Sequence, residues 1–171
     1  MHLPPAPPAI STCIQRAAAF YHEPPLILDA IHEVERGWRG ARILNTNGTH
    51  DHGYNQINTI WRQQLHAQGY TMREVTNHDC ANVFVSAWIL RQDIHRAHGF
   101  WRGVGWYNSQ NPYHAAQYME RVWKAAYRLT HPVTAPAPGT SPAFTATPLL
   151  PATSTREPRL AWHQTLIQGI R

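Results

Sequence analysis

Acidic residues and cysteines are scarce in this sequence, and each shortage limits the functions that the chain can have. The 171 residues hold only 10 Asp and Glu, so a reaction that needs a carboxylic acid has few candidates. The two cysteines are too far apart for a CxxC redox pair and too few for a zinc site of paired CxxC motifs. Apolar runs stay well short of the roughly 18 residues that cross a membrane, so the sequence predicts no transmembrane segment.

The positive charge that remains indicates an anionic partner. Lys and Arg number 15, giving a net charge of +5 and a pI near 9.6. All but one of these cations are Arg, scattered without a run of five or six. Such scatter argues against a nucleic-acid-binding arm, and we expect no nucleic acid partner. At 43% hydrophobic and 15% charged residues, the chain is also a poor candidate for charge-driven disorder.

Proline marks the expected domain boundaries. It crowds the segments 1–10 and 131–158 but is rare between them. We therefore expect a Pro-rich N-terminal segment, a folded domain over 11–130, a Pro/Thr/Ala-rich linker over 131–158, and a short amphipathic segment over 159–171. Within the domain, the sequence predicts a first helix capped by Ser11 and running through Tyr21, and a second with Pro24 and Pro25 in its first turn and a stop at Gly37. Helical periodicity predicts further helices over 60–68, 82–98 and 112–129. The polar stretch 38–58 predicts turns or a small irregular β-hairpin.

Cys13 and Cys80 admit two interpretations. As a disulfide they would tie the first helix to the segment before the 82–98 helix and would indicate an oxidising compartment. Alternatively, they are two buried, unpaired thiols. The N-terminal segment has neither a basic region nor an apolar run typical of a signal sequence, so it does not decide between them.

The 12 histidines are weak candidates for a metal site. The sequence contains no HExxH motif, and the side chains of His50 and His52 would point to opposite sides of an extended segment. The pair His95 and His98 offers too few ligands by itself. We therefore predict no metal and no cofactor.

Glu35 is the best candidate for an acid catalyst. It ends an apolar helix, four residues after Ile31, where the chain turns at Gly37 into the polar stretch. An apolar environment raises the pKa of a carboxyl, which can then act as a general acid near neutral pH. Helix position alone, however, favours a solvated helix-end carboxylate beside Arg36 and Arg39. Glu33, roughly 200° away around the same helix, serves as an internal control.

Five ordered motifs resemble the soluble lytic transglycosylases of the lysozyme superfamily, and in particular the branch attached to conjugative pili and to type III and type IV secretion systems. That branch shares an opening Cys-Ile, an Asn-Gly-Thr-x-Asp-x-Gly-x-x-Gln-Ile-Asn stretch, Cys-x-Asn-Val, Ala-Trp-Ile-Leu and Val-Gly-x-Tyr. Here the motifs lie in the same order at 13–14, 47–58, 80–83, 87–90 and 104–107.

The resemblance implies a lysozyme-like α+β domain, mostly helical, with specific roles for its residues. Glu35 would be the single catalytic acid and base, and Tyr107 the tyrosine beside it. Cys13 and Cys80 would form the disulfide of this branch. Substrate would also contact Gln56, Asn58, Trp106 and Asn108, and support would come from Asp51, Gly53 and Ser109. We expect Asp51 to brace its loop.

The implied activity is cleavage of the β-1,4 bond between N-acetylmuramic acid and N-acetylglucosamine in peptidoglycan, with a 1,6-anhydro product, to open the wall for a pilus or secretion apparatus. The expected partners are peptidoglycan glycan strands together with pilus or secretion-system components. The protein would act as a periplasmic or secreted monomer, its signal sequence not present in this chain. Two alternatives are a hydrolytic muramidase, with Asp51 positioning water, and a catalytically weak wall-binding module.

Two departures from the family pattern bear on the site. Arg36 stands where the family has serine, and it would depress the pKa of Glu35 if its side chain folded inward but matter little if it pointed to solvent. Tyr54 and Asn55 replace the usual Leu-Met, which puts polar groups in place of an apolar floor.

Overall fold

Seven α-helices and a small sheet make up residues 9–131, the part of the chain that this computed structural model describes. The prediction of a predominantly helical α+β domain is confirmed. The predicted segment 159–171 and nearly all of the predicted 1–10 and 131–158 segments lie outside the described residues. In chain order the elements are α1 (Ile10–Tyr21), α2 (Pro25–Glu35), β1 (Arg42–Leu44), β2 (His50–His52), β3 (Ile57–Asn58), the 3-10 helix η1 (Thr59–Trp61), α3 (Arg62–Ala67), α4 (Met72–Asn77), α5 (Asp79–Ala97), α6 (Phe100–Asn108) and α7 (Pro112–Thr130).

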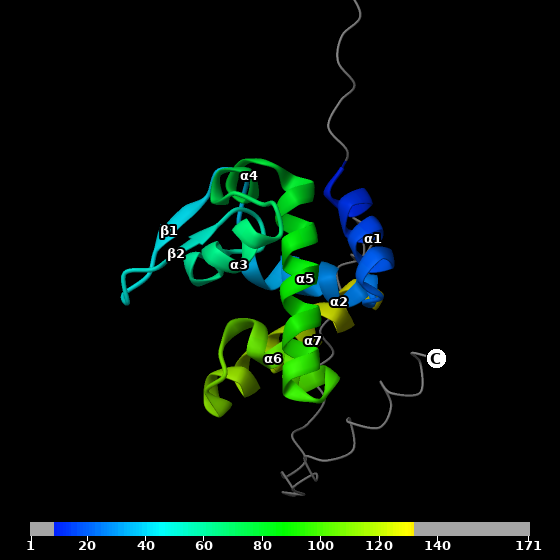
Figure 1. Ribbon diagram of the computed structural model, residues 1–171. Helices are drawn as coiled ribbons and strands as arrows, with labels where there is room; N and C mark the ends of the chain where they lie inside the picture. The colour runs from blue at the N-terminus through cyan, green and yellow to red at the C-terminus, as the bar shows by residue number, and fades with distance from the viewer. Residues whose placement is uncertain (1–8, 132–171) are drawn as a thin grey trace, which may run out of the picture. The chain divides into compact units, whose positions relative to one another are not determined.

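Helix α5 organises the core. Figure 1 shows it at the centre, with the sheet on one side and α1 and α2 on the other. On one face of α5, Val83 and Leu90 are buried against residues such as Ile14 and Ile31 of the first two helices. On another, Val85 and Ile89 are buried with a set near the sheet, Ile57, Leu65 and Val75. The two apolar clusters therefore hold the sheet and the helical layer to a common helix.

The predicted polar stretch forms a three-stranded antiparallel sheet. Strands β1, β2 and β3 follow one another in order, with Ile43 opposite Asp51 and Asp51 opposite Asn58. The register thus places an acid and an amide side by side in the middle of the sheet.

Helix α2 ends one residue earlier than its sequence indicates. Pro25 occupies the first helical position, as expected, but the left-handed residue that stops the helix is Arg36, with φ 51° and its N–H bonded to the carbonyl of His32. Gly37 is needed for a different reason. Its N–H donates to the carbonyl of Tyr54 at 3.0 Å, and the loop at 53–56 passes so close that no side chain fits.

We expect Gly37→Ala to destabilise the domain by about 2 kcal/mol, the usual cost of overpacking a tight contact. A Cβ at this position would lie 2.1 Å from the Gly53 oxygen and 2.5 Å from Nε2 of Gln56. Urea unfolding would measure the change in free energy. Gly99→Ala is the control, because Gly99 has an extended φ of 179° and nothing within 4 Å of an added Cβ. Equal losses in the two variants would contradict the close contact.

Two further helix boundaries differ from the predictions. Helix α1 begins at Ile10 and has no side-chain cap; the carbonyl of Ala9, and not the side chain of Ser11, accepts from the N–H of Thr12 at 3.0 Å. Helix α5 begins at Asp79, three residues before the predicted start at Asn82. Asp79 is favourable there, because an acid in the first turn complements the helix dipole.

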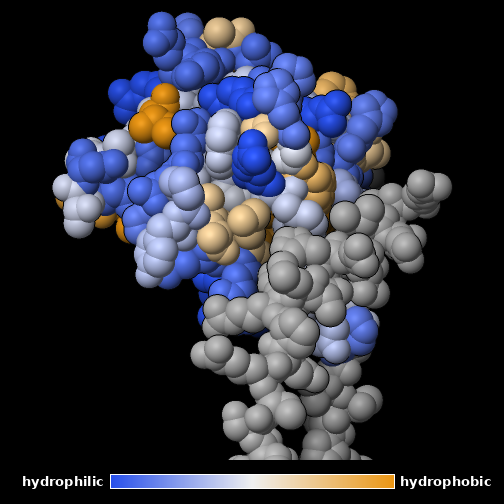
Figure 2. All heavy atoms as spheres, turned by 90° about the horizontal axis from the view of Figure 1, so that it is seen from below, coloured by the Kyte–Doolittle hydropathy of each residue, from blue (hydrophilic) through white to orange (hydrophobic). Residues whose placement is uncertain are grey.

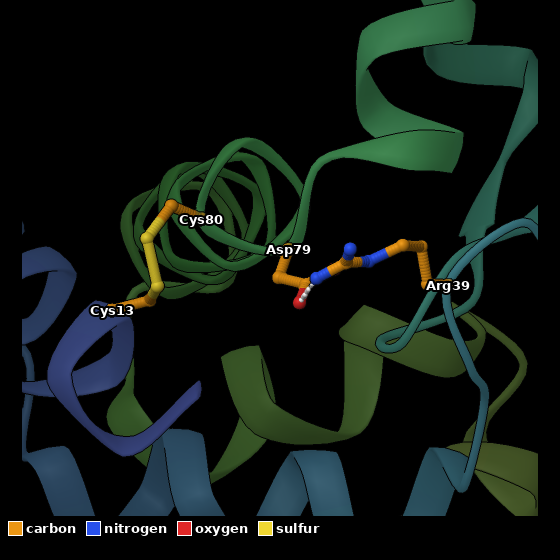
Figure 3. Close-up of a disulfide and its surroundings, with 4 residues drawn as sticks. All are labelled: Cys13, Arg39, Asp79 and Cys80. Atoms are coloured by element: carbon orange, nitrogen blue, oxygen red, sulfur yellow. Dashed lines mark hydrogen bonds and ion pairs between the residues drawn. A yellow bond between two sulfur atoms is a disulfide. The ribbon is translucent and has the colours of Figure 1, made fainter. Parts of the chain in front are cut away.

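A disulfide joins α1 to the first turn of α5 (Figure 3). Cys13 and Cys80 are bonded, with their Cα atoms 5.0 Å apart. Beside them the Arg39 guanidinium forms a two-pronged ion pair with the carboxylate of Asp79, including a 2.8 Å bond from Nε to Oδ1. The start of α5 is thereby tied both to α1 and to the loop that follows α2.

The surface is largely polar where it can be seen from below. Figure 2 shows hydrophilic residues predominating on this face, with hydrophobic ones in small separate groups. Within residues 9–131, no helix is long and apolar enough to cross a membrane.

Candidate active site

Glu35 lies at the last position of α2 and lines a cleft of about 350 Å³ between the sheet and α6. The cleft brings together residues from four segments of the chain that are distant in sequence. Six of the residues singled out from the sequence line it: Glu35, Asp51, Gln56, Asn58, Tyr107 and Asn108.

Trp106 and Ser109 line an adjoining hollow of about 290 Å³. This hollow shares four lining residues with the cleft: Ile60, Trp61, Tyr107 and Asn108. Trp106 was expected as a cleft aromatic beside Tyr107, and it lines the adjoining hollow together with Tyr107. Its role in substrate binding stays a prediction. The indole in the cleft itself is that of Trp61, packed edge-on against Trp88 with ring centroids 5.6 Å apart.

Burial makes Glu35 a good candidate for the general acid, because it shifts the pKa of the carboxyl toward neutral pH. Loss of hydration raises the pKa of Glu35 to about 7, a hydrogen bond from Tyr118 opposes the rise, the charge of Asp51 adds to it and that of Arg121 opposes it. A pKa near 7 leaves both protonation states populated at neutral pH. A group that must first donate and then accept a proton needs both states.

The neighbouring arginines do not pair with Glu35. Arg36 is exposed and donates from Nε to the carbonyl of Glu33 at 3.1 Å, while Arg39 is engaged with Asp79. The structure therefore favours the partly buried carboxyl over the solvated helix-end carboxylate, and it directs the Arg36 side chain away from the acid.

The tyrosine in contact with Glu35 is Tyr118, which the sequence did not single out. Its hydroxyl donates to Oε1 of Glu35 at 2.5 Å. Tyr107, which was expected beside Glu35, lines the same cleft. It stacks on Tyr118 with centroids 6.1 Å apart, and its own hydroxyl donates to the carbonyl of Asn55 at 3.0 Å. Tyr118 lies on the apolar stripe of α7, 83 residues from Glu35, so periodicity identified it only as a core residue.

Asp51 and Asn58 brace the sheet. The two carboxylate oxygens of Asp51 accept from the side-chain amides of Asn58 at 2.7 Å and Asn45 at 2.9 Å. The Asn58 amide also donates to Thr49 Oγ1 and accepts from the N–H of Ile60. Asn58 was expected to bind substrate. In the structure, its side-chain amide holds the cleft wall in shape through these bonds.

The turn before Gln56 is held by a side chain from α5. Gly53 adopts a φ of +68°, and an added Cβ would lie 2.2 Å from Nδ2 of Asn82. Asn82 donates to the carbonyl of His52 and accepts from the N–H of Asn55 at 2.8 Å. Gln56, at φ 49°, donates from Nε2 to the carbonyl of Gly53 at 2.7 Å. These bonds fix the loop that faces Glu35.

Asn55 is part of this support and not of the cleft floor. It is fully buried, and its Oδ1 lies 2.9 Å from Nδ1 of His32 on α2. Asn55 therefore links the loop to the helix that carries Glu35.

Comparison with known proteins finds two groups of relatives. Protein IpgF of Shigella flexneri is 32% identical over 98 residues, which cover 57% of this chain and 64% of IpgF. Invasion protein IagB of Salmonella typhi is 29% identical over 122 residues, 68% of this chain and 76% of IagB. The chain is similar to both. It spans just under two thirds of the length of IpgF, and no protein-family model matches it.

No group of three or more His, Cys, Asp or Glu within residues 9–131 is placed to hold a metal ion. Of the histidines considered from the sequence, His52 has another partner: its Nδ1 lies 2.7 Å from the hydroxyl of Thr76.

We expect Glu35→Gln to be more stable than the wild type at high pH and equally stable at low pH. The native pKa of Glu35 is about 7, above the value of 4.5 for an unhindered Glu, so the native state binds the proton more tightly. Below pH 4.5 wild type and variant should be equally stable. Between 4.5 and 7 the wild type loses stability, and above pH 7 the variant should lead by about 3 kcal/mol.

Urea unfolding at pH 4, 6 and 8 would measure this difference, with the exposed Glu33→Gln as the control. A constant difference across this range would contradict the burial of an ionisable Glu35.

Proposed function

We propose that this protein is a peptidoglycan lytic transglycosylase, which cleaves the β-1,4 bond between N-acetylmuramic acid and N-acetylglucosamine. The observation that carries the proposal is a single carboxyl of pKa about 7, held by Tyr118 in a cleft lined with amides and an indole. Sugar rings stack on indole faces and their hydroxyls bond to amides. The likeness to an invasion protein and the five ordered motifs support the same function.

The chemistry needs one carboxyl that acts twice. Glu35 donates its proton to the glycosidic oxygen, and the C1–O bond breaks as the N-acetylglucosamine side leaves as an alcohol. The resulting Glu35 carboxylate is stabilised by the Tyr118 hydroxyl. It then removes the proton of the muramic acid C6 hydroxyl as that oxygen bonds to C1. The 1,6-anhydro ring closes without water, and Glu35 regains its proton.

A hydrolytic muramidase is the alternative, because Asp51 lines the same cleft. Ordinary glycosidases use a second carboxylate to bind water or to attack C1. Both oxygens of Asp51 accept from amides of the sheet, which favours a bracing role.

The products that the protein releases from purified sacculi distinguish a transglycosylase from a muramidase and from a wall-binding module. The digest is reduced with borohydride and analysed by mass spectrometry, which distinguishes 1,6-anhydro ends from reducing ends. We expect anhydro products from wild type and from Asp51→Asn in so far as it folds. Reducing ends alone would establish the muramidase. Absence of products from a folded wild-type protein that still binds sacculi would establish a wall-binding module.

The cellular setting forms part of the proposal. The disulfide fits an oxidising compartment, which agrees with a periplasmic or secreted monomer that opens the wall for a pilus or secretion apparatus.

A further inference from the structure

A second hollow lies between α2 and α7, the helices that carry Glu35 and Tyr118. It measures about 360 Å³ and shares no lining residue with the cleft or its adjoining hollow. Its lining, which we call the basic trough, consists of Glu33, Val34, Arg36, Arg121, Lys124 and Arg128.

Four of these six residues are cations. Arg121, Lys124 and Arg128 are spaced three and four residues apart, which puts them on one face of α7 over about 10 Å. Lys124 pairs with Glu120 at 2.7 Å, but both side chains are more than half exposed, so the pair is weak and exchangeable. The trough is thus a hollow with four cations and one acid, Glu33, in its lining.

The shape and chemistry of the trough fit a peptide. Guanidinium groups bind carboxylates through paired hydrogen bonds, and three arginines line this hollow. Val34 offers an apolar surface among them. A membrane surface would meet a flat or protruding basic patch, whereas these cations surround a concavity. Carboxylates flanking an apolar side chain match this arrangement.

We propose that the basic trough binds an acidic peptide segment of a partner protein, with an apolar residue between its carboxylates, and that binding alters the reactivity of Glu35 through Arg121 and Tyr118.

Arg121 connects the trough to the acid. Its guanidinium carbon lies 5.3 Å from the centroid of the Tyr118 ring, and the Tyr118 hydroxyl donates to Glu35. The charged and titratable groups that act on Glu35 are Tyr118 and Arg121 from α7, Asp51 from β2 and Tyr107 from α6. Among them Arg121 is the cation, and its charge lowers the pKa of Glu35. Peptide carboxylates that neutralise Arg121 should therefore raise this pKa.

Binding is tested first, with a fluorescein-labelled peptide of glutamates around one leucine and a glutamine version as its control. Fluorescence anisotropy would give the dissociation constant. Arg36→Gln with Arg128→Gln should weaken binding by about tenfold or more. Arg16→Gln with Arg73→Gln makes the same change in net charge on exposed positions outside the trough, and should change binding less than about twofold.

Three outcomes would overturn the binding proposal. They are equal losses in the two double variants, no preference over the glutamine peptide, and binding of anionic vesicles but not of the peptide to the trough.

The effect of the peptide on Glu35 can be measured in two ways, and only the kinetic measurement depends on the proposed function. NMR titration of the Glu35 carboxyl carbon reports its pKa without catalysis. Saturating peptide should raise this pKa in the wild type and leave it unchanged in Arg121→Gln, where the pKa should already be raised. The alkaline limb of sacculus cleavage should move in parallel. A bound peptide that leaves the titration unchanged would overturn the coupling, whereas a protein with the expected titration and no cleavage would overturn only the proposed function.

Discussion

Replacing Glu35 with Gln is expected to lower the rate of sacculus cleavage by about 10³-fold or more. The amide matches the carboxyl in shape and still accepts the Tyr118 hydrogen bond, but it can neither protonate the glycosidic oxygen nor take a proton from the C6 hydroxyl. General acid–base catalysis contributes about 10² to 10⁴ in rate, and here one group supplies both transfers. Chromatography of the released muropeptides would measure the loss.

Glu33→Gln is the matched control for this loss. Glu33 is an exposed residue of the same helix that lines the basic trough and not the cleft, so with no ligand in the trough its variant should retain the wild-type rate within about twofold. Because Glu35→Gln should be at least as stable as the wild type, lost activity could not be attributed to unfolding. Comparable cleavage by wild type and Glu35→Gln would remove Glu35 from the mechanism.

The sequence identified the acid more readily than its surroundings. Glu35 could be found because the helix end, the apolar stripe and the ordered motifs all converge on it. Tyr118 could not, because a tyrosine on an apolar helical stripe is typical of a core residue, and only the packing of α7 on α2 brings its hydroxyl to the carboxyl. Contacts between distant segments leave no local periodic signal.

Among the helices, too, some could be predicted from the sequence and others could not. Long periodic helices such as α7, Pro112–Thr130, could be predicted nearly to the residue. Helix α4 was missed although Thr71 and Glu74 form a capping box, because it has only six residues. Helix α6 was missed because Gly103 and Gly105 lower its helical propensity, and its stability comes from packing against α5 and α7.

Buried polar contacts behind the cleft tie the site to the whole fold. Asn82 of α5 holds the loop at 53–55, and Asn55 in turn contacts His32 on α2. Unpaired buried polar groups are costly, so these bonds favour one loop conformation. Since α2 also carries Glu35, the same contacts set the separation between the acid and the opposite cleft wall.

Removal of the disulfide by Cys13→Ser with Cys80→Ser is expected to destabilise the domain by about 4 kcal/mol. The bond closes a loop across a sequence separation of 67, and without it the unfolded chain gains the corresponding entropy. The native state would also lose a covalent tie between α1, which buries Ile14 and Ala17 in the core, and α5. Urea unfolding of the double variant against the oxidised wild type would measure the loss.

Reduction of the wild type with dithiothreitol provides the control for this experiment, since it breaks the same bond without changing residue composition. The reduced protein and the double variant should unfold at similar urea concentrations. Neither cysteine lines the cleft, so the variant should keep its cleavage rate wherever it remains folded. A change in unfolding free energy below about 1 kcal/mol would contradict the loop-closure argument, whereas lost activity in a folded variant would show that α1 positions Glu35 through α2.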